Sequence, residues 1–215
     1  MASVDVLFVI DATGSMHNWI KAANEKAEDI AADLRFHHQR TKFRFGCVCY
    51  RDNVADSNDK NQSFDFDEEI ENLSLFFEDV EAGGGGQDGP EDWVGALNDA
   101  FSLKWEAEKK IIIWLADASA HGARFGGGNK FPQEEAKLIP LVEKLATDGY
   151  IFTGIAIKKW ANTTFQEMKK IYDAKGGVKF TIEEFNKEAS NENIYDILTT
   201  TASTTVTDSL RYTDY

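Results

Sequence analysis

The chain has 215 residues, of which 42% are hydrophobic and 28% are charged, and its formal net charge is -14 at pH 7. A chain of this length and composition can bury one sizeable core, so a single domain is expected. An acidic surface repels phosphate backbones and anionic lipid, which argues against nucleic acid and membrane surfaces as partners.

No stretch of the sequence indicates a membrane span or a secretion signal. No apolar run approaches the ~18–20 residues that a spanning helix needs, and residues 1–5 lack the basic segment of a signal peptide. Cys47 and Cys49 lie two positions apart on one predicted strand, where their side chains cannot easily reach disulfide geometry. We therefore expect a reduced, cytoplasmic protein.

Apolar periodicity predicts alternating strands and helices. An almost unbroken apolar run at 4–10 is typical of a central parallel strand whose two faces are both covered. From Asn18 onward, apolar residues recur every three or four positions, as in an amphipathic helix. The same patterns predict, in chain order, strands at 43–50 and 64–66, helices at 70–80 and about 94–101, a strand at 111–115, a helix at 134–147, a strand at 150–157, a helix at 165–174, a strand at 178–181 and a weaker helix from about Ile194.

Two runs of biased composition and two prolines refine these predictions. The run 83–86 of four glycines predicts a flexible spacer, because no Gly-Lys-Ser/Thr follows it as in a phosphate-binding loop. Pro90 is expected in the first turn of the next helix, where proline is tolerated, and Pro140 is expected to kink or split its helix. The threonine-rich run 199–205 is typical of a loose tail.

The order of these elements predicts an α/β fold with a doubly wound, mostly parallel central sheet and helices on both faces. We find no internal repeat and no low-complexity linker. We assign 1–185 to one domain, and 186–215 to a C-terminal helix and tail that pack on it or flank it.

Two aspartates follow apolar strands, Asp11 one residue past the run at 4–10 and Asp117 two residues past the run at 111–115. Binding sites in parallel sheets form outside the carboxyl ends of the strands, and two carboxylates meeting there repel each other unless a cation lies between them. Thr13 and Ser15 add hydroxyls at alternating positions, and such hard oxygen ligands suit Mg²⁺ or Mn²⁺. The sequence therefore predicts a divalent-cation site.

The residues Asp-Ala-Thr-Gly-Ser-Met at 11–16 resemble the metal-ion-dependent adhesion site of von Willebrand factor A domains. That motif is Asp-x-Ser/Thr-x-Ser, with a threonine from a second loop and an aspartate from a third. A narrower similarity, to the A domains attached to alpha-kinases, covers roughly 4–185. It is carried by Tyr50-Arg51-Asp52, by Pro90-Glu91-Asp92, and by Ala116-Asp117-Ala118 followed by His121-Gly122.

The resemblance implies a Rossmann-like domain at 1–185 with Asp11, Thr13, Ser15 and Asp117 as ligands of one cation. The chain departs from the motif in the second loop. Counting back from the following helix, the usual threonine position falls near Glu91, with Asp88 and Asp92 as alternatives. A carboxylate there can coordinate directly or through water. We predict Glu91.

In the resembled family a Glu or Asp of a partner protein completes the coordination of the cation, which implies a protein-binding domain and not an enzyme. One alternative is a metal-dependent phosphohydrolase with Asp11 as nucleophile or Glu91 as base. Such phosphatases need a second aspartate where Thr13 stands. The other alternative is a regulatory segment of an alpha-kinase-like protein with a purely structural metal. The partner and the oligomeric state cannot be read from the sequence.

Other polar residues near this edge carry weaker signals. His17 and His121 fall in the predicted loops, where we expect surface or supporting roles. Asp52, Asp56 and Asp59 can hold a second cation loosely, but a solvated loop is the interpretation that we prefer.

Overall fold

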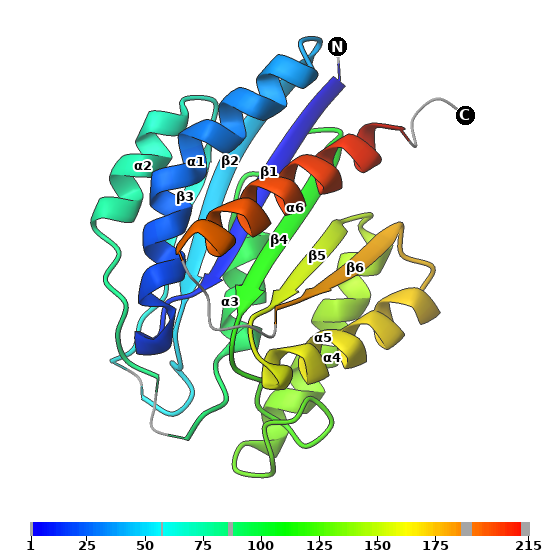
Figure 1. Ribbon diagram of the computed structural model, residues 1–215. Coiled ribbons are helices and arrows are strands. Elements are labelled where there is room, and N and C mark those ends of the chain that lie inside the picture. The colour runs from blue at the N-terminus through cyan, green and yellow to red at the C-terminus, as the bar shows by residue number, and fades with distance from the viewer. Residues whose placement is uncertain (1, 57, 86–87, 186–190, 212–215) are drawn as a thin grey trace.

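The computed structural model describes residues 2–56, 58–85, 88–185 and 191–211, whose strands form a six-stranded sheet in the order β3-β2-β1-β4-β5-β6 (Figure 1). All neighbouring strands pair in parallel except β3, which is antiparallel to β2. The predicted doubly wound, mostly parallel sheet is confirmed. The strands are β1 Ala2–Asp11, β2 Thr41–Tyr50, β3 Gln62–Asp67, β4 Lys109–Ala116, β5 Ile151–Ala156 and β6 Lys179–Glu184.

Helices cover both faces of this sheet. A short 3-10 turn, Gly14–Met16, leads from β1 into the first helix. One face is covered by α1 His17–His37, α2 Ile70–Glu78 and α6 Asn191–Arg211. The other face is covered by α3 Trp93–Ser102, α4 Pro132–Thr147 and α5 Lys159–Ala174.

The central strand β1 shows why the sequence lacks polar alternation. Successive side chains of a strand point to opposite faces. Val6 and Phe8 pack into the layer with α1, while Leu7 and Val9 pack into the layer with α3. All four side chains are at most 5% exposed. Both faces of the strand are buried, so both need apolar residues.

An aromatic stack fixes α3 against the sheet. The rings of Trp93 and Trp114 are stacked with their centroids 4.7 Å apart, and the indole Nε1 of Trp114 donates a hydrogen bond to the Tyr50 hydroxyl at 3.1 Å. All three side chains are at most 1% exposed. This cluster packs the start of α3 against strands β2 and β4.

Helix α6 corrects the expectation for the threonine-rich run. Residues 199–205 lie inside this helix and not in a loose tail. Leu198 and Ala202 are at most 2% exposed in the same core as α1, and the Thr205 hydroxyl lies 3.0 Å from that of Thr153 on β5. Helix propensity is a weak preference that the burial of one helical stripe overrides. Of the segment assigned separately, 186–190 and 212–215 lie outside the described residues, and the boundary at 185 stays a prediction.

The expectation for Pro90 is corrected, and that for Pro140 is corrected in part, since a kink there stays a prediction. Pro90 precedes α3 instead of lying in its first turn, because the helix begins at Trp93 and the Asp92 side chain caps it by accepting from the backbone N–H of Gly95 at 2.6 Å. Pro140 does not split α4, which runs through it without interruption.

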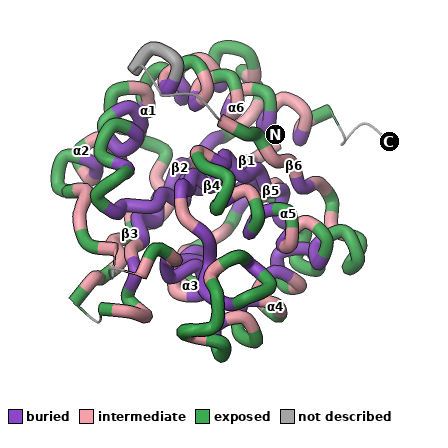
Figure 2. Tube along the Cα trace, turned by 60° about the horizontal axis from the view of Figure 1, so that its bottom comes forward, coloured by how far each residue is buried: buried purple, intermediate pink, exposed green. Residues whose placement is uncertain are grey.

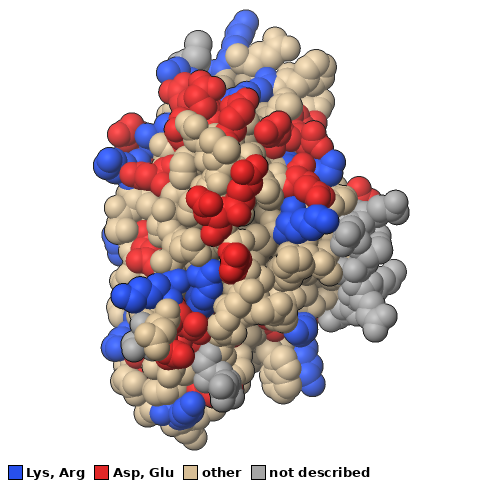
Figure 3. Space-filling view, turned by 90° about the vertical axis from the view of Figure 1, so that its left-hand side faces the viewer, with Lys and Arg blue, Asp and Glu red and all other residues tan. Residues whose placement is uncertain are grey.

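On the face around α2 and β3, acidic and basic side chains are interspersed, without a continuous basic patch among the described residues (Figure 3). In the described part of the chain, the helices are too short or too polar to cross a bilayer.

The packing of α6 predicts a position-dependent loss of stability. Leu198 in α6 is 2% exposed, whereas Leu75 in α2 is 59% exposed. Leu198→Ala should lower the free energy of unfolding by about 2–5 kcal/mol, because it leaves a cavity in the core. Leu75→Ala should change it by less than about 0.5 kcal/mol. Urea denaturation measures both, and equal losses would contradict the assignment of α6 to the core.

Candidate metal centre

Three loops meet at the carboxyl end of the sheet, where backbone hydrogen bonds join them. The N–H of Gly83 donates to the carbonyl of Ala12 at 2.9 Å, and the N–H of Glu91 donates to the carbonyl of Ser119 at 2.9 Å. Figure 2 brings this end forward and shows buried strands at the centre with exposed loops around them. The loops enclose an open pocket of about 700 Å³.

The last residue of β1, Asp11, is held in one orientation by the loop that follows it. This side chain is fully buried, and its Oδ1 accepts hydrogen bonds from the Thr13 backbone N–H at 2.9 Å and from the Thr13 hydroxyl at 2.7 Å. Its Oδ2 is buried without a hydrogen-bond partner among the described residues. Ser15, which is exposed, and Thr13 both line the pocket. A buried carboxylate oxygen left unpaired calls for a ligand such as a cation.

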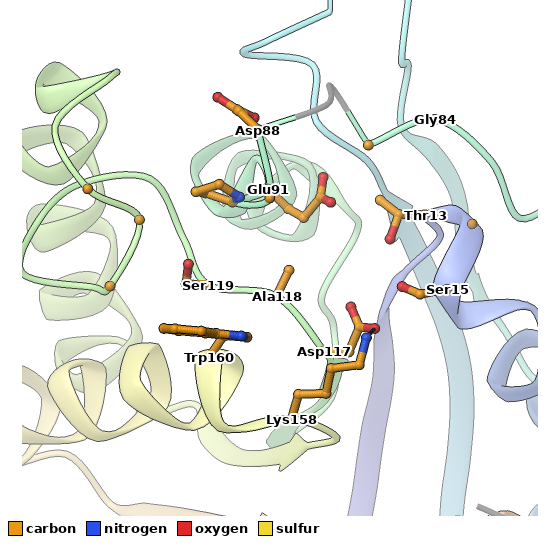
Figure 4. A pocket seen from close by; sticks show the side chains of 17 residues that line it. Thr13, Ser15, Gly84, Asp88, Glu91, Asp117, Ala118, Ser119, Lys158 and Trp160 are labelled. Carbon is orange, nitrogen blue, oxygen red and sulfur yellow. Dashed lines mark hydrogen bonds and ion pairs between the residues drawn. The ribbon is translucent and has the colours of Figure 1, made fainter. Parts of the chain in front are cut away.

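Of the three candidate acids in the second loop, Glu91 points into this pocket. Figure 4 shows its carboxylate directed toward the space that Thr13, Ser15 and Asp117 also face. Glu91 is 4% exposed, and within the described part of the chain its Oε2 has no hydrogen-bond partner. The alternative Asp92 caps α3. The structure thus places Thr13, Ser15, Glu91 and Asp117 around one pocket, which Asp88 also lines, while Asp11 is buried behind Thr13.

Asp117 has a partner that the sequence analysis missed. Its Oδ2 lies 2.5 Å from the ammonium Nζ of Lys158, the residue that precedes α5. Asp117 is 5% exposed, whereas the Lys158 side chain is 54% exposed and can therefore leave the pair without large rearrangement. The only signal in the sequence was a lysine just past the apolar strand β5.

Crowded carboxylates shift each other's ionisation. Burial raises the pKa of Asp11 to about 7, and the charge of Asp117 adds to this shift. Burial likewise raises the pKa of Glu91 to about 10, with the charges of Asp11, Asp52 and Asp117 adding to it. Without a cation, protons on Glu91 and in part on Asp11 thus reduce the negative charge of the site at neutral pH. The donor set of carboxylates and hydroxyls therefore fits a hard divalent cation.

Part of the glycine segment lines the pocket, and the prediction of a flexible spacer stays a prediction. Gly84 and Gly85 line the pocket with φ angles of 76° and 109°, which favour glycine. The N–H of Gly85 donates to Asp59 Oδ2 at 2.6 Å, and a Cβ on Gly85 would lie 3.3 Å from Glu91 Oε1. The fourth glycine lies outside the described residues.

The expectation of a solvated loop is wrong for Asp52. It is fully buried, and its Oδ1 lies 2.9 Å from the imidazole Nε2 of His121, which is 2% exposed. Asp88 joins them, since one potential ligand atom from each of the three side chains lies within 4.8 Å of the other two. His17 is exposed, in line with the expected surface role.

The sequence matches a family model described as von Willebrand factor A domain over residues 5–184. It is also similar to alpha-protein kinase vwkA of Dictyostelium discoideum, with 30% identity over 164 residues, which is 73% of this chain and 26% of that protein. The chain thus spans about a quarter of the length of this curated relative.

Solved structures share the fold at low identity. The PilB minor pilin from Streptococcus sanguinis superposes with a TM-score of 0.62 and 11% identity, covering 100% of this chain and 63% of the pilin. The open conformation of the pilus adhesin SpaC from Lactobacillus rhamnosus GG gives 0.63 and 11%, covering 97% and 30%. Proximal thread matrix protein 1 from the mussel byssus gives 0.58 and 15%, covering 95% and 46%.

The raised pKa of Asp11 predicts a pH-dependent stability in the absence of metal. Its folded pKa of about 7 exceeds the ordinary 3.8, so the stability that its neutral form contributes is lost as the pH rises through 7. In EDTA, the wild type should lose on the order of 1–3 kcal/mol relative to Asp11→Asn between about pH 5 and pH 8. Denaturant unfolding measures this difference, and parallel pH profiles of the two proteins would contradict it.

The orientation of Glu91 predicts that it matters most among the second-loop acids. Glu91→Gln should weaken Mg²⁺ binding at least about tenfold, because it removes a charged donor at the pocket. Asp88→Asn should weaken it less, and the change Asp79→Asn on an exposed acid should have no effect. Isothermal titration calorimetry measures all three variants. A loss seen only with Asp88→Asn would show that the wrong acid was chosen.

Proposed function

This chain belongs to the von Willebrand factor A domain family, and we propose on that basis that it is a divalent-cation-dependent protein-binding domain. The observation that carries this proposal is the pair of buried carboxylate oxygens, Asp11 Oδ2 and Glu91 Oε2, which have no hydrogen-bond partner among the described residues. Glu91 lines an open pocket, and so does Thr13, which is hydrogen-bonded to Asp11, so a cation held between these residues would be accessible from outside.

The residues of the site would have different roles in binding Mg²⁺ or Mn²⁺. Thr13 orients Asp11 through two hydrogen bonds and leaves one carboxylate oxygen free. Ser15 and Asp117 contribute further oxygens from the loops that follow β1 and β4. When bound, the cation would offer an open coordination position to a Glu or Asp carboxylate of a partner protein.

Charge decides whether such a site attracts an acidic partner. Asp11, Glu91 and Asp117 together carry three negative charges when ionised, one more than a divalent cation supplies. Lys158 neutralises Asp117 in an ion pair of 2.5 Å, and its ammonium restores a balance of three negative and three positive charges. A neutral site repels an incoming carboxylate less than an anionic one does. We place Glu91 one water away from the cation, because direct ligation would fill the position that the partner needs.

We propose a binding role in preference to an enzymatic one. Phosphoryl transfer on an aspartate requires an acid near the nucleophile. Two residues after Asp11 stands Thr13, whose hydroxyl is already bonded to Asp11. The similarity to a kinase spans about a quarter of that protein, so catalysis by a separate segment is compatible with a binding or regulatory role here.

A cytoplasmic location is part of the same proposal. Cys47 and Cys49 are free and fully buried, with their sulfur atoms 3.6 Å apart on one strand. Their reduced state suits a reducing compartment.

Cation-dependent capture of acidic peptides tests the proposal. A displayed library of random peptides should yield clones retained in saturating Mg²⁺ and released by EDTA, and replacing one Glu or Asp of such a peptide by its amide should abolish retention. Thr13→Ala should weaken retention at least about tenfold, because Asp11 loses a hydrogen bond that positions it. Thr147→Ala is the control, since Thr147 is exposed beyond the far end of the sheet.

Peptide retention that neither EDTA nor Thr13→Ala changes would mean that the peptides bind to another face of the domain. Loss of metal binding alone, with peptide retention unchanged, would mean that the cation is structural. Release of inorganic phosphate from a phosphoester substrate, dependent on Asp11, would favour the phosphohydrolase alternative.

A further inference from the structure

A second group of metal-ligating side chains lies beside the first. Asp52 follows β2, Asp88 lies in the loop before α3, and His121 lies in the loop after β4. One potential ligand atom from each lies within 4.8 Å of the other two. Asp11, Thr13, Ser15 and Asp117 take no part in this group, so the two sets of residues are distinct.

Two of these side chains, His121 and Asp52, are fully buried and contact each other. The side chains of His121 and Asp52 are 1% and 0% exposed, and His121 Nε2 lies 2.9 Å from Asp52 Oδ1. A second ring packs against the histidine, since Phe131 meets it edge-on with the centroids 4.9 Å apart. The imidazole is therefore held in place before any ligand arrives.

The hydrogen bonds within this group leave polar atoms unsatisfied. Asp52 Oδ2 and His121 Nδ1 are buried without a hydrogen-bond partner among the described residues, as is Asp88 Oδ1. The other oxygen of Asp88 pairs with the Lys130 ammonium at 2.8 Å. Leaving such atoms unpaired destabilises the folded protein. A bound cation would satisfy several of them at once.

We infer that Asp52, Asp88 and His121 form a second cation site, which takes Mn²⁺ or Zn²⁺ in preference to Mg²⁺. Metal–ligand distances of about 2.0–2.2 Å put two ligand atoms at most about 4.4 Å apart, so a small shift of the side chains would bring the three ligand atoms, all within 4.8 Å of one another, onto one ion. An imidazole beside two carboxylates suits Mn²⁺ or Zn²⁺, whereas Mg²⁺ prefers oxygen alone. This inference does not rest on the proposed function, because no ligand of the first site is needed.

Counting bound Mn²⁺ on the full chain tests the inference. The wild type should bind two equivalents by calorimetry, and His121→Gln should lose one of them. Asp11→Ala should also lose one, but from the other site. His17→Gln is the matched control, since His17 is an exposed histidine at the start of α1, and it should keep both equivalents.

Pulsed electron paramagnetic resonance identifies the ligand of the remaining ion. Asp11→Ala loaded with one equivalent of Mn²⁺ should show coupling to an imidazole nitrogen. The coupling should vanish when His121→Gln is added and persist when His17→Gln is added. Asp52→Asn provides a near-isosteric second variant if the change at His121 prevents folding, and it too should lose one equivalent.

A single equivalent of Mn²⁺ in the wild type that His121→Gln leaves bound would overturn the inference. A single equivalent that His121→Gln loses and Asp11→Ala keeps would support it and count against the first site. Nitrogen coupling that survives His121→Gln would overturn it as well, by placing the ion on another of the four histidines. Failure of the proposed function looks different, because it appears as peptide retention indifferent to Mg²⁺ while both Mn²⁺ equivalents remain.

Discussion

Repulsion among buried carboxylates is the constraint on which the carboxyl end of this sheet depends. The acids there differ in how their negative charge is compensated. Asp92 caps a helix, while Lys158 supplies a counter-charge to Asp117. Glu91 has neither. Burial and the neighbouring carboxylates raise its pKa to about 10, so without a cation Glu91 is protonated at neutral pH. Five acids in this region are at most 5% exposed, namely Asp11, Asp52, Glu91, Asp92 and Asp117.

The core explains why the charges gather at one end. Strands β1 and β4 are buried on both faces, so their lengths hold almost only apolar side chains, and polar groups come where the strands stop. Because neighbouring strands are parallel, those stops coincide at one edge. The exception within β1, Asp5, lies toward the opposite end and is held by the Arg44 guanidinium at 2.7 Å.

The sequence was sufficient where the signal is local. The apolar runs predicted β1 and β4, and the loop residues Asp11 and Thr13 follow directly from the end of β1. Contacts between distant segments left no such trace. Asp52 and His121 are 69 positions apart, and only the fold makes one a partner of the other. For the same reason the pattern around Lys158 could not reveal its ion pair with Asp117. The helix α6 was underestimated because its threonines are stabilised by burial and not by propensity.

Shared loops link the two candidate sites physically. Asp88 and Glu91 lie three positions apart in one loop, and Asp117 and His121 lie four apart in another. The charge of Asp52 helps to raise the pKa of Glu91, so a cation beside Asp52 would favour the ionised form of Glu91 and thereby the first site. Two nearby dications also repel each other, which opposes this effect. Whichever contribution is larger, the coupling is reciprocal: an ion at either site changes the affinity of the other by the same factor.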